Sequence, residues 1–215
     1  MFKAVCFDFD YTLGDCTDSI VEGFRHGFAG LGWPAPDREA VRATIGYLLE
    51  DSYEMLTGDR DPERQARFRA LFSEVAVERQ RRETTLFPGG EELLRGLREA
   101  GVRVAIVSTK RGDTIDIILE RLGLSDVVEL VIGSADVKRH KPDPEGLLAA
   151  MDRLGVRPEE TLFCGDTVLD AGAAKNAGTH FAAVLNGTTP AAAFDDFPTD
   201  HISPDLWDLA KWLGI

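Results

Sequence analysis

Pairs of aspartates stand at two points of the chain where a short apolar run gives way to turn residues. The first run ends in Asp8-Phe9-Asp10, and a later one ends in a Gly-Asp segment that carries Asp166 and Asp170. Ionised carboxylates are costly in the dry interior of a strand, so we expect them at strand ends that share one edge. Four carboxylates at one edge would repel one another unless a cation joined them. An all-oxygen set of this kind suits a hard divalent ion such as Mg²⁺.

A hydroxyl and an ammonium group are expected at the same edge. Ser108 directly follows an apolar, β-branched run, and Lys141 stands in His140-Lys141-Pro142 after another. Lys141 would add a second positive charge beside a metal ion, and Ser108 could hydrogen-bond to the oxygens of an anion. Each piece alone is weak evidence, because Asp-x-Asp is common by chance and Asp166 could simply cap a helix.

Apolar runs that alternate with helical patterns must position these groups. The runs predict buried parallel strands over residues 2–9, 102–107, 127–132, 161–164 and 179–185. The helical patterns cover residues 89–100, 113–122, 144–154 and 168–177, and most are closed by a glycine suited to a C-cap. Alternating strands and helices imply right-handed crossovers and a mostly parallel sheet with helices on both faces.

One stretch of the chain breaks this alternation. From about residue 17 to residue 85 the sequence contains only helical segments, at 19–31, 38–44, 47–56 and 62–82. We interpret it as a small all-helical cap domain, residues 17–85, inserted after the first strand. Residues 1–16 and 86–215 then form the α/β core domain, in which Pro88-Gly89-Gly90 restarts the α/β pattern.

The polar motifs occur in the order in which the haloacid dehalogenase superfamily carries its own: Asp8 and Asp10 with Thr12, then Ser108, then Lys141, then Asp166 with Asp170. The chain resembles the phosphatase branch of this superfamily and is most similar to phosphoglycolate phosphatase-like members with a helical cap. The resemblance extends over nearly the whole chain. It implies a Rossmann-like three-layer core, Mg²⁺ as cofactor and a small phosphate ester as substrate.

The resemblance also implies roles for the aspartates. Asp8 is expected to be the nucleophile that forms an aspartyl phosphate, and Asp10 the general acid and base. Asp8, the main-chain carbonyl of Asp10, and Asp166 are the expected metal ligands. Asp170 is expected either to bind the metal or to lie behind the residues that do.

Three further residues are expected to bind the phosphate: Ser108, Thr109 and Lys141. Lys141 and the metal together would neutralise a phosphate dianion despite the acidic protein around it. Thr109 stands where the family commonly has asparagine. By the same resemblance, Thr12 is expected to brace the loop and Asp10 rather than to react.

Five residues are candidates for substrate specificity: Tyr11, Gly46, Tyr47, Lys110 and Arg111. Tyr11 replaces the usual glycine of the family, and it could restrict the loop after the first strand, contact a substrate or simply pack. Gly46 and Tyr47 correspond in position to a loop that such caps lower onto the active site. Lys110 and Arg111 follow the phosphate-binding serine, and they could meet a substrate or begin the next helix.

Charge and composition exclude other classes of protein. The 215 residues include 24 basic and 37 acidic side chains, and the net charge of −13 disfavours nucleic acid and anionic membranes as partners. No apolar run approaches the roughly 20 residues of a membrane helix. Three distant cysteines, Cys6, Cys16 and Cys164, and an N-terminus unlike a signal peptide indicate the cytoplasm. The oligomeric state has no signature in the sequence.

The sequence therefore predicts a Mg²⁺-dependent phosphatase that acts on a small phosphomonoester, either phosphoglycolate-like or a sugar phosphate. An acid two residues after the nucleophile favours phosphate ester cleavage over dehalogenation, because a halide leaving group needs no proton. Two alternatives stay open. A phosphomutase of the β-phosphoglucomutase type shares every core motif, and a non-catalytic metal- or phosphate-binding module could retain the fold.

Overall fold

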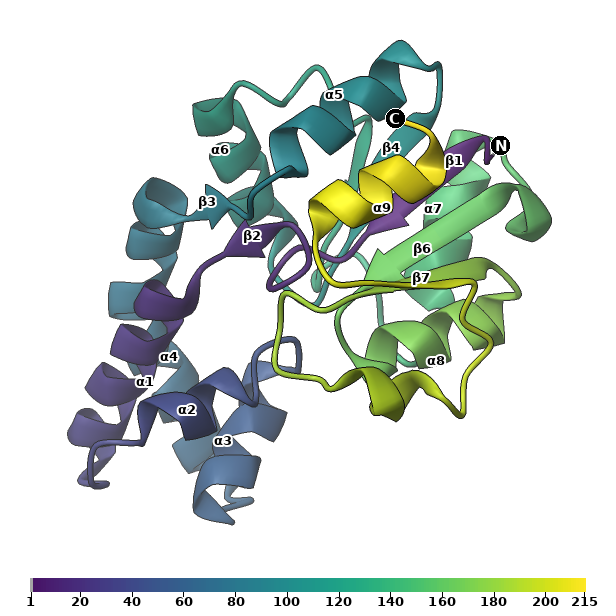
Figure 1. Cartoon of the computed structure of the whole chain (residues 1–215). Helices are drawn as coiled ribbons and strands as arrows, with labels where there is room; N and C mark the ends of the chain where they lie inside the picture. The colour runs from purple at the N-terminus through teal and green to yellow at the C-terminus, as the bar shows by residue number, and fades with distance from the viewer. Residues whose placement is uncertain (1) are drawn as a thin grey trace. The chain divides into compact units, whose positions relative to one another are not determined.

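The computed structural model describes residues 2–215, which divide into two compact units (Figure 1). One unit consists of the chain up to Asp15 together with Leu86–Ile215, and the other is Cys16–Thr85. Each unit has its own interior of buried apolar side chains. The second unit is thus an insertion into the first.

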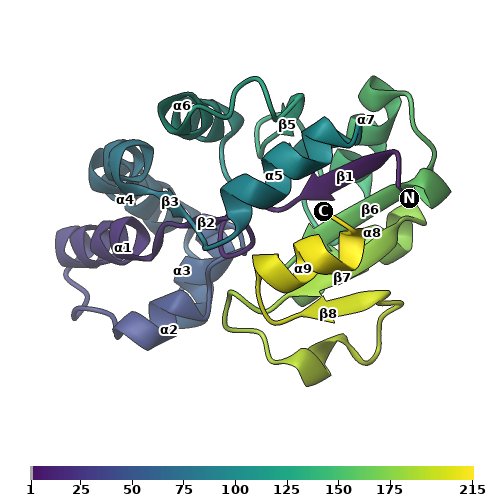
Figure 2. The same ribbon diagram turned by 45° about the horizontal axis from the view of Figure 1, so that its top comes forward.

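A six-stranded parallel sheet forms the centre of the first unit, within the part of the chain that the structure describes (Figure 2). The strand order is β5-β4-β1-β6-β7-β8. The bounds are Ala4–Phe7 for β1, Arg103–Val107 for β4, Leu130–Ile132 for β5, Thr161–Gly165 for β6, His180–Val184 for β7 and His201–Ser203 for β8. Strand β1 pairs with β4 on one side and β6 on the other, and its four residues are all buried.

Helices cover both faces of this sheet. Val5 and Phe7 of β1 share a hydrophobic cluster with residues of α5 (Gly90–Glu99), α6 (Gly112–Leu122) and α9 (Leu206–Leu213). Ala4 and Cys6 point to the opposite face, where they join residues of α7 (Glu145–Leu154) and α8 (Val168–Ala177). Short 3₁₀ helices, η1 (Pro158–Glu160) and η2 (Ala191–Phe194), complete the unit. The three-layer α/β fold predicted from the alternating pattern is confirmed.

The inserted unit is all helical, as the sequence predicts. It contains α1 (Thr17–Leu31), α2 (Arg38–Arg42), α3 (Leu49–Thr57) and α4 (Pro62–Glu83). A methyl group added at Gly27 of α1 would lie 2.5 Å from the ring of Phe68 on α4, so glycine is needed for this close approach. The interior is an aromatic cluster made of Phe24, Phe28, Tyr53, Phe68 and Phe72.

The structure departs from the predicted elements at short strands. Strands β2 (Gly14–Asp15) and β3 (Thr85–Leu86) pair in a separate sheet, and neither they nor β8 are predicted. Two or three residues are too few to show a periodic pattern. The strand predicted over residues 127–132 begins only at Leu130, because the Val127 and Val128 N–H groups donate to the Leu124 carbonyl in a turn.

Candidate active site

Four segments bring polar side chains to the carboxyl ends of the sheet strands. Asp8 follows β1, Ser108 follows β4, Asp166 follows β6, and Lys141 lies in the segment before α7. The Asp8 N–H donates to the Cys164 carbonyl over 2.9 Å, so the pairing of β1 with β6 continues to the site itself. Because β1 lies between β4 and β6, these strand ends are neighbours, at the edge where open α/β sheets bind ligands.

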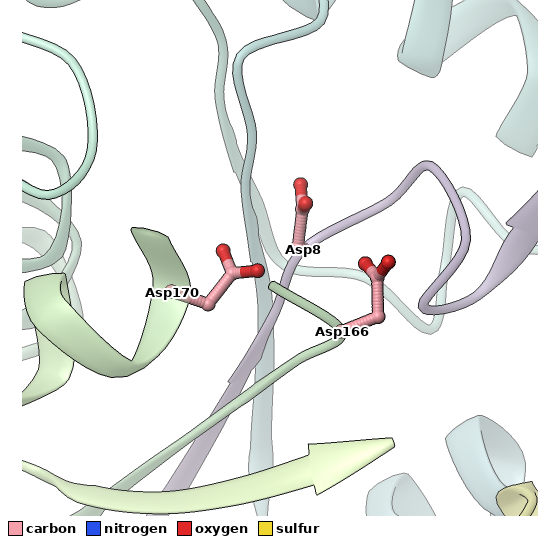
Figure 3. A group of neighbouring side chains, drawn as sticks. All are labelled: Asp8, Asp166 and Asp170. Atoms are coloured by element: carbon pink, nitrogen blue, oxygen red, sulfur yellow. The ribbon is translucent and has the colours of Figure 1, made fainter. Parts of the chain in front are cut away.

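Three buried carboxylates converge at this edge (Figure 3). Asp8 comes from the end of β1, Asp166 from the turn after β6, and Asp170 from the first turn of α8. Each contributes a carboxylate oxygen to a group whose members all lie within 4.8 Å of one another. Their exposed fractions are 2% or less, so water does little to screen their charges.

Lys141 supplies the ammonium group of the cluster. Its Nζ lies 2.9 Å from Oδ2 of Asp8 and 2.5 Å from Oδ1 of Asp170. The other oxygen of Asp170 accepts hydrogen bonds from the N–H and the hydroxyl of Thr167, at 3.0 and 2.6 Å. Both oxygens of Asp170 are therefore engaged by protein donors, which favours a supporting role over a metal-binding one.

Burial and mutual repulsion change the acidity of these groups. Burial raises the pKa of Asp8 to about 6, although the Lys141 ammonium opposes the rise. Burial also raises the pKa of Asp166 well above its usual range, and the charges of Asp170 and Asp8 add to this. Burial alone would lower the pKa of Lys141, but Asp170 and Asp8 outweigh it and raise the pKa above its usual value. The site holds three carboxylates against one ammonium at its centre.

The residues present fit a divalent cation. Oδ2 of Asp8 is buried, and no donor is aligned on it for a hydrogen bond, although Lys141 Nζ is near. Oδ1 of Asp166 accepts a 3.0 Å hydrogen bond from the Thr12 hydroxyl. The donor set is all oxygen, which is the preference of a hard ion. A second positive charge would offset both the burial and the mutual repulsion that raise the pKa values of Asp8 and Asp166. Asp8 and Asp166 are the residues that would hold it.

Asp10 points to a different partner. Both of its carboxylate oxygens lie 3.0 Å from Nζ of Lys110, and its side chain is not part of the three-carboxylate group. The sequence-based expectation assigns only its main-chain carbonyl to a metal, and that role stays a prediction. Ser108 is buried, and its hydroxyl accepts a 3.2 Å hydrogen bond from the Lys110 N–H. Ser108, Thr109 and Lys141 share the wall of one cavity.

The loop between Asp8 and β2 is tightly bonded. Thr12 is fully buried, and it braces Asp166 through its hydroxyl, in addition to any part it plays toward Asp10. Tyr11 has a φ of +62°, the left-handed region that favours glycine, and its N–H donates to the Gly14 carbonyl. Its ring is 2% exposed and lies 6.3 Å from the ring of Phe87. Packing accounts for this side chain, so of the three possibilities for Tyr11 the structure favours a packed loop tyrosine.

Sequence reasoning missed two residues of the loop after β7. The Asn186 side-chain amide donates to the Thr12 carbonyl over 3.0 Å. A methyl group added at Gly187 would lie 2.1 Å from Oδ2 of Asp166, so this loop passes directly beside the carboxylate. The Asn-Gly pair after a predicted strand is a turn signal that could have indicated a loop at the same edge of the sheet.

The remaining specificity candidates are Arg111 in the α/β unit and Gly46 and Tyr47 in the helical unit. The Arg111 guanidinium pairs with Asp113 in the first turn of α6, with one N···O distance of 2.8 Å. Gly46 and Tyr47 belong to the helical unit, where the Tyr47 N–H donates to the Thr44 carbonyl and Gly46 has a φ of +100°. Substrate contacts by these three residues stay a prediction.

Comparisons with known proteins agree with this geometry. A family model described as haloacid dehalogenase-like hydrolase matches residues 5–184. A pyrophosphatase PpaX from Bacillus velezensis is 31% identical over 212 residues, covering 99% of this chain and 96% of the relative. A phosphoglycolate phosphatase from Shigella boydii is 32% identical, covering 94% of this chain and 76% of that protein.

A solved structure is similar in fold as well as in sequence. It is a haloacid dehalogenase-like hydrolase from Bacteroides fragilis, with a TM-score of 0.93 and 39% identity. The match covers 97% of this chain and all of the other.

Proposed function

Because the chain belongs to the haloacid dehalogenase-like hydrolases, we propose that it is a Mg²⁺-dependent phosphatase that cleaves small phosphomonoesters through an aspartyl phosphate on Asp8. Membership of the family confirms the resemblance inferred from the motifs, and with it the expectation of a hydrolytic enzyme. The metal, the covalent intermediate and the residue roles are the substance of the proposal.

The observation that carries the proposal is the setting of Asp8. Its carboxylate is buried at the end of the central strand, with Oδ1 held by the Phe9 N–H over 2.7 Å and Oδ2 without an aligned donor. A carboxylate fixed on one oxygen is oriented to attack with the other. The adjacent ammonium of Lys141 draws a phosphate dianion to it.

Two chemical steps follow from this arrangement. An oxygen of Asp8 forms a bond to phosphorus as the bond from phosphorus to the ester oxygen breaks, and Asp10 gives a proton to that leaving oxygen. Asp10 then takes a proton from a water molecule whose oxygen attacks the same phosphorus. The bond to Asp8 breaks, inorganic phosphate leaves, and both aspartates return to their starting state.

The other groups of the site hold the phosphate. Lys141 and the Ser108 hydroxyl are the candidates to bind its non-bridging oxygens, and Asp170 keeps the Lys141 ammonium in place through their 2.5 Å contact. A bound Mg²⁺ ion would polarise the phosphoryl group and neutralise charge that develops on it. Asp166, fixed by the Thr12 hydroxyl, would hold that ion together with Asp8.

The substrate class is proposed from the relatives. The similar proteins include a pyrophosphatase and a phosphoglycolate phosphatase, so phosphoglycolate, sugar phosphates and inorganic pyrophosphate are the first compounds to test. Among residues 2–215 no helix is both long and apolar enough to cross a bilayer. The three cysteines are buried and lie far apart in the sequence, a pattern unlike a disulfide framework, and we propose a cytoplasmic location on that basis.

Release of phosphate from p-nitrophenyl phosphate, with and without Mg²⁺, tests the proposal. We expect turnover that needs Mg²⁺, stops with a chelator and is abolished in Asp8→Asn. The exposed Asp196→Asn serves as the matched control and should keep full activity. Metal-independent turnover, or an active Asp8→Asn, would refute the mechanism. A sugar phosphate that isomerises without releasing phosphate would indicate a mutase, and no turnover on the whole panel would indicate a binding module.

A further inference from the structure

A second lysine is buried beside the site. The side chains of Lys110 and Lys141 are 5% and 6% exposed, whereas every other lysine of residues 2–215 is exposed. Burial of an ammonium group is costly unless a partner compensates it. Lys141 is accounted for by Asp8 and Asp170, so the placement of Lys110 needs a separate explanation.

The partner of Lys110 is the other proposed catalytic carboxylate. Nζ of Lys110 lies 3.0 Å from each of the two Asp10 oxygens, and the Asp10 side chain is itself only 13% exposed. A cation placed symmetrically between both oxygens of a carboxylate opposes rotation about the bond that joins the carboxylate to the rest of the side chain. The two lysines thus serve different aspartates, Lys141 the nucleophile and Lys110 the acid and base.

The backbone of Lys110 is held firmly enough to fix this contact. Its N–H donates to the Ser108 hydroxyl over 3.2 Å, and its carbonyl accepts the Ser134 N–H over 3.0 Å. A methyl group added at Gly133 would lie 2.9 Å from the same carbonyl oxygen, so the segment after β5 lies directly against it. Asp136 closes that segment by accepting the Gly133 N–H over 2.8 Å.

We propose that Lys110 is a positioning residue that fixes the orientation of the Asp10 carboxylate toward the leaving group. This inference rests on the proposed function, in which Asp10 transfers the proton. It replaces the expectation that Lys110 contacts substrate, because the ammonium is directed at Asp10. Lys110 acts through Asp10, so replacing Lys110 should lower kcat only in a protein that still contains Asp10.

The first test compares Lys110→Met with Lys110→Arg and with Lys138→Met, an exposed lysine as control. Methionine keeps most of the side-chain length without the charge. A misplaced catalytic group costs about 10²-fold, so we expect Lys110→Met to lower kcat by about that factor and to leave KM nearly unchanged. Lys110→Arg, whose guanidinium also reaches two carboxylate oxygens, should retain more of kcat than Lys110→Met. A rise in KM with unchanged kcat would instead assign Lys110 to substrate binding.

A double-mutant cycle gives the sharper test. On the background of Asp10→Asn, the further change Lys110→Met should cost little, because the group that Lys110 positions is already lost. Independent losses that multiply in the double variant would overturn the proposal.

Crystal structures of the wild type and Lys110→Met provide a readout that needs no activity. We expect the Asp10 carboxylate to leave its wild-type orientation in the variant, and an unmoved carboxylate would contradict the positioning role. If the wild type cleaves no phosphate ester but Asp10 still moves, the proposed function fails while the positioning contact stands. If Lys110→Met does not fold, the crystal structure of Lys110→Arg is compared with that of the wild type instead. The proposal then requires the guanidinium of the variant to contact both carboxylate oxygens of Asp10.

Discussion

Replacing the proposed nucleophile by its amide should make the metal-free protein more stable while it destroys activity. Asp8 is 1% exposed, and the charges of Asp166 and Asp170 lie close to it. Its pKa is raised from 3.8 to about 6, and each tenfold change in proton affinity equals about 1.4 kcal/mol. The ionised carboxylate therefore lowers the free energy of unfolding by about 3 kcal/mol above pH 7.

The sign of the pH dependence follows from the direction of that shift. Between about pH 4 and pH 6 the folded state holds the Asp8 proton more tightly than the unfolded state does. In the metal-free wild type this group therefore makes the free energy of unfolding fall as pH rises through that window. Asp8→Asn lacks this titration, so the stability difference between variant and wild type should open between pH 4 and pH 6.

Thermal unfolding in the presence of a chelator measures the effect. A gain of up to about 3 kcal/mol corresponds to roughly 6–12 °C in melting temperature for a chain of this size, with the full gain at pH 8 and little at pH 4. The control Asp196→Asn removes an exposed charge and should leave the melting temperature nearly unchanged. A melting temperature of Asp8→Asn that equals the wild-type value at pH 8, or a gain of the same size at both pH values, would refute the reasoning.

Three other outcomes are expected. Mg²⁺ should raise the melting temperature of the wild type more at pH 8 than at pH 5, because Asp8 must lose its proton to bind the ion; calorimetry that shows equal shifts would contradict this. Asp10→Asn should impair alkyl phosphates more than p-nitrophenyl phosphate, whose leaving group needs no proton, and equal losses in steady-state assays would exclude the acid role. Gly187→Ala should weaken Mg²⁺ affinity by about 10-fold or more, since the new methyl group displaces Asp166, whereas Gly112→Ala, with 3.5 Å of clearance, should not.

The layers of the fold could be predicted because buried strands and helix ends leave local patterns of apolar residues and glycines in the sequence. The four residues of β1 are all apolar, and a strand buried on both faces requires this. Gly123, Gly155 and Gly178 end their helices in the left-handed conformation, as their positions indicate. Short edge elements such as β8 carry no comparable signal.

The candidate site was predictable in its residue types but not in its pairings. The order of the motifs indicated that Asp8, Ser108, Lys141 and Asp166 belong to one edge of the sheet. Sequence spacing cannot tell which carboxylate a given lysine meets, because side-chain direction depends on backbone turns. The contact of Lys110 with Asp10 is therefore visible only in three dimensions.

The central place of β1 has a consequence for biosynthesis. This strand leaves the ribosome before both of its partner strands, so Ala4 pairs only after Arg103 on one side and Thr161 on the other have been synthesised. The helices of residues 17–83 can meet one another long before either partner strand exists. Closing such long loops is slow, and an unpaired apolar strand is prone to aggregate. The segment that carries Asp8, the proposed nucleophile, therefore stays without its sheet partners while the whole helical insertion is synthesised.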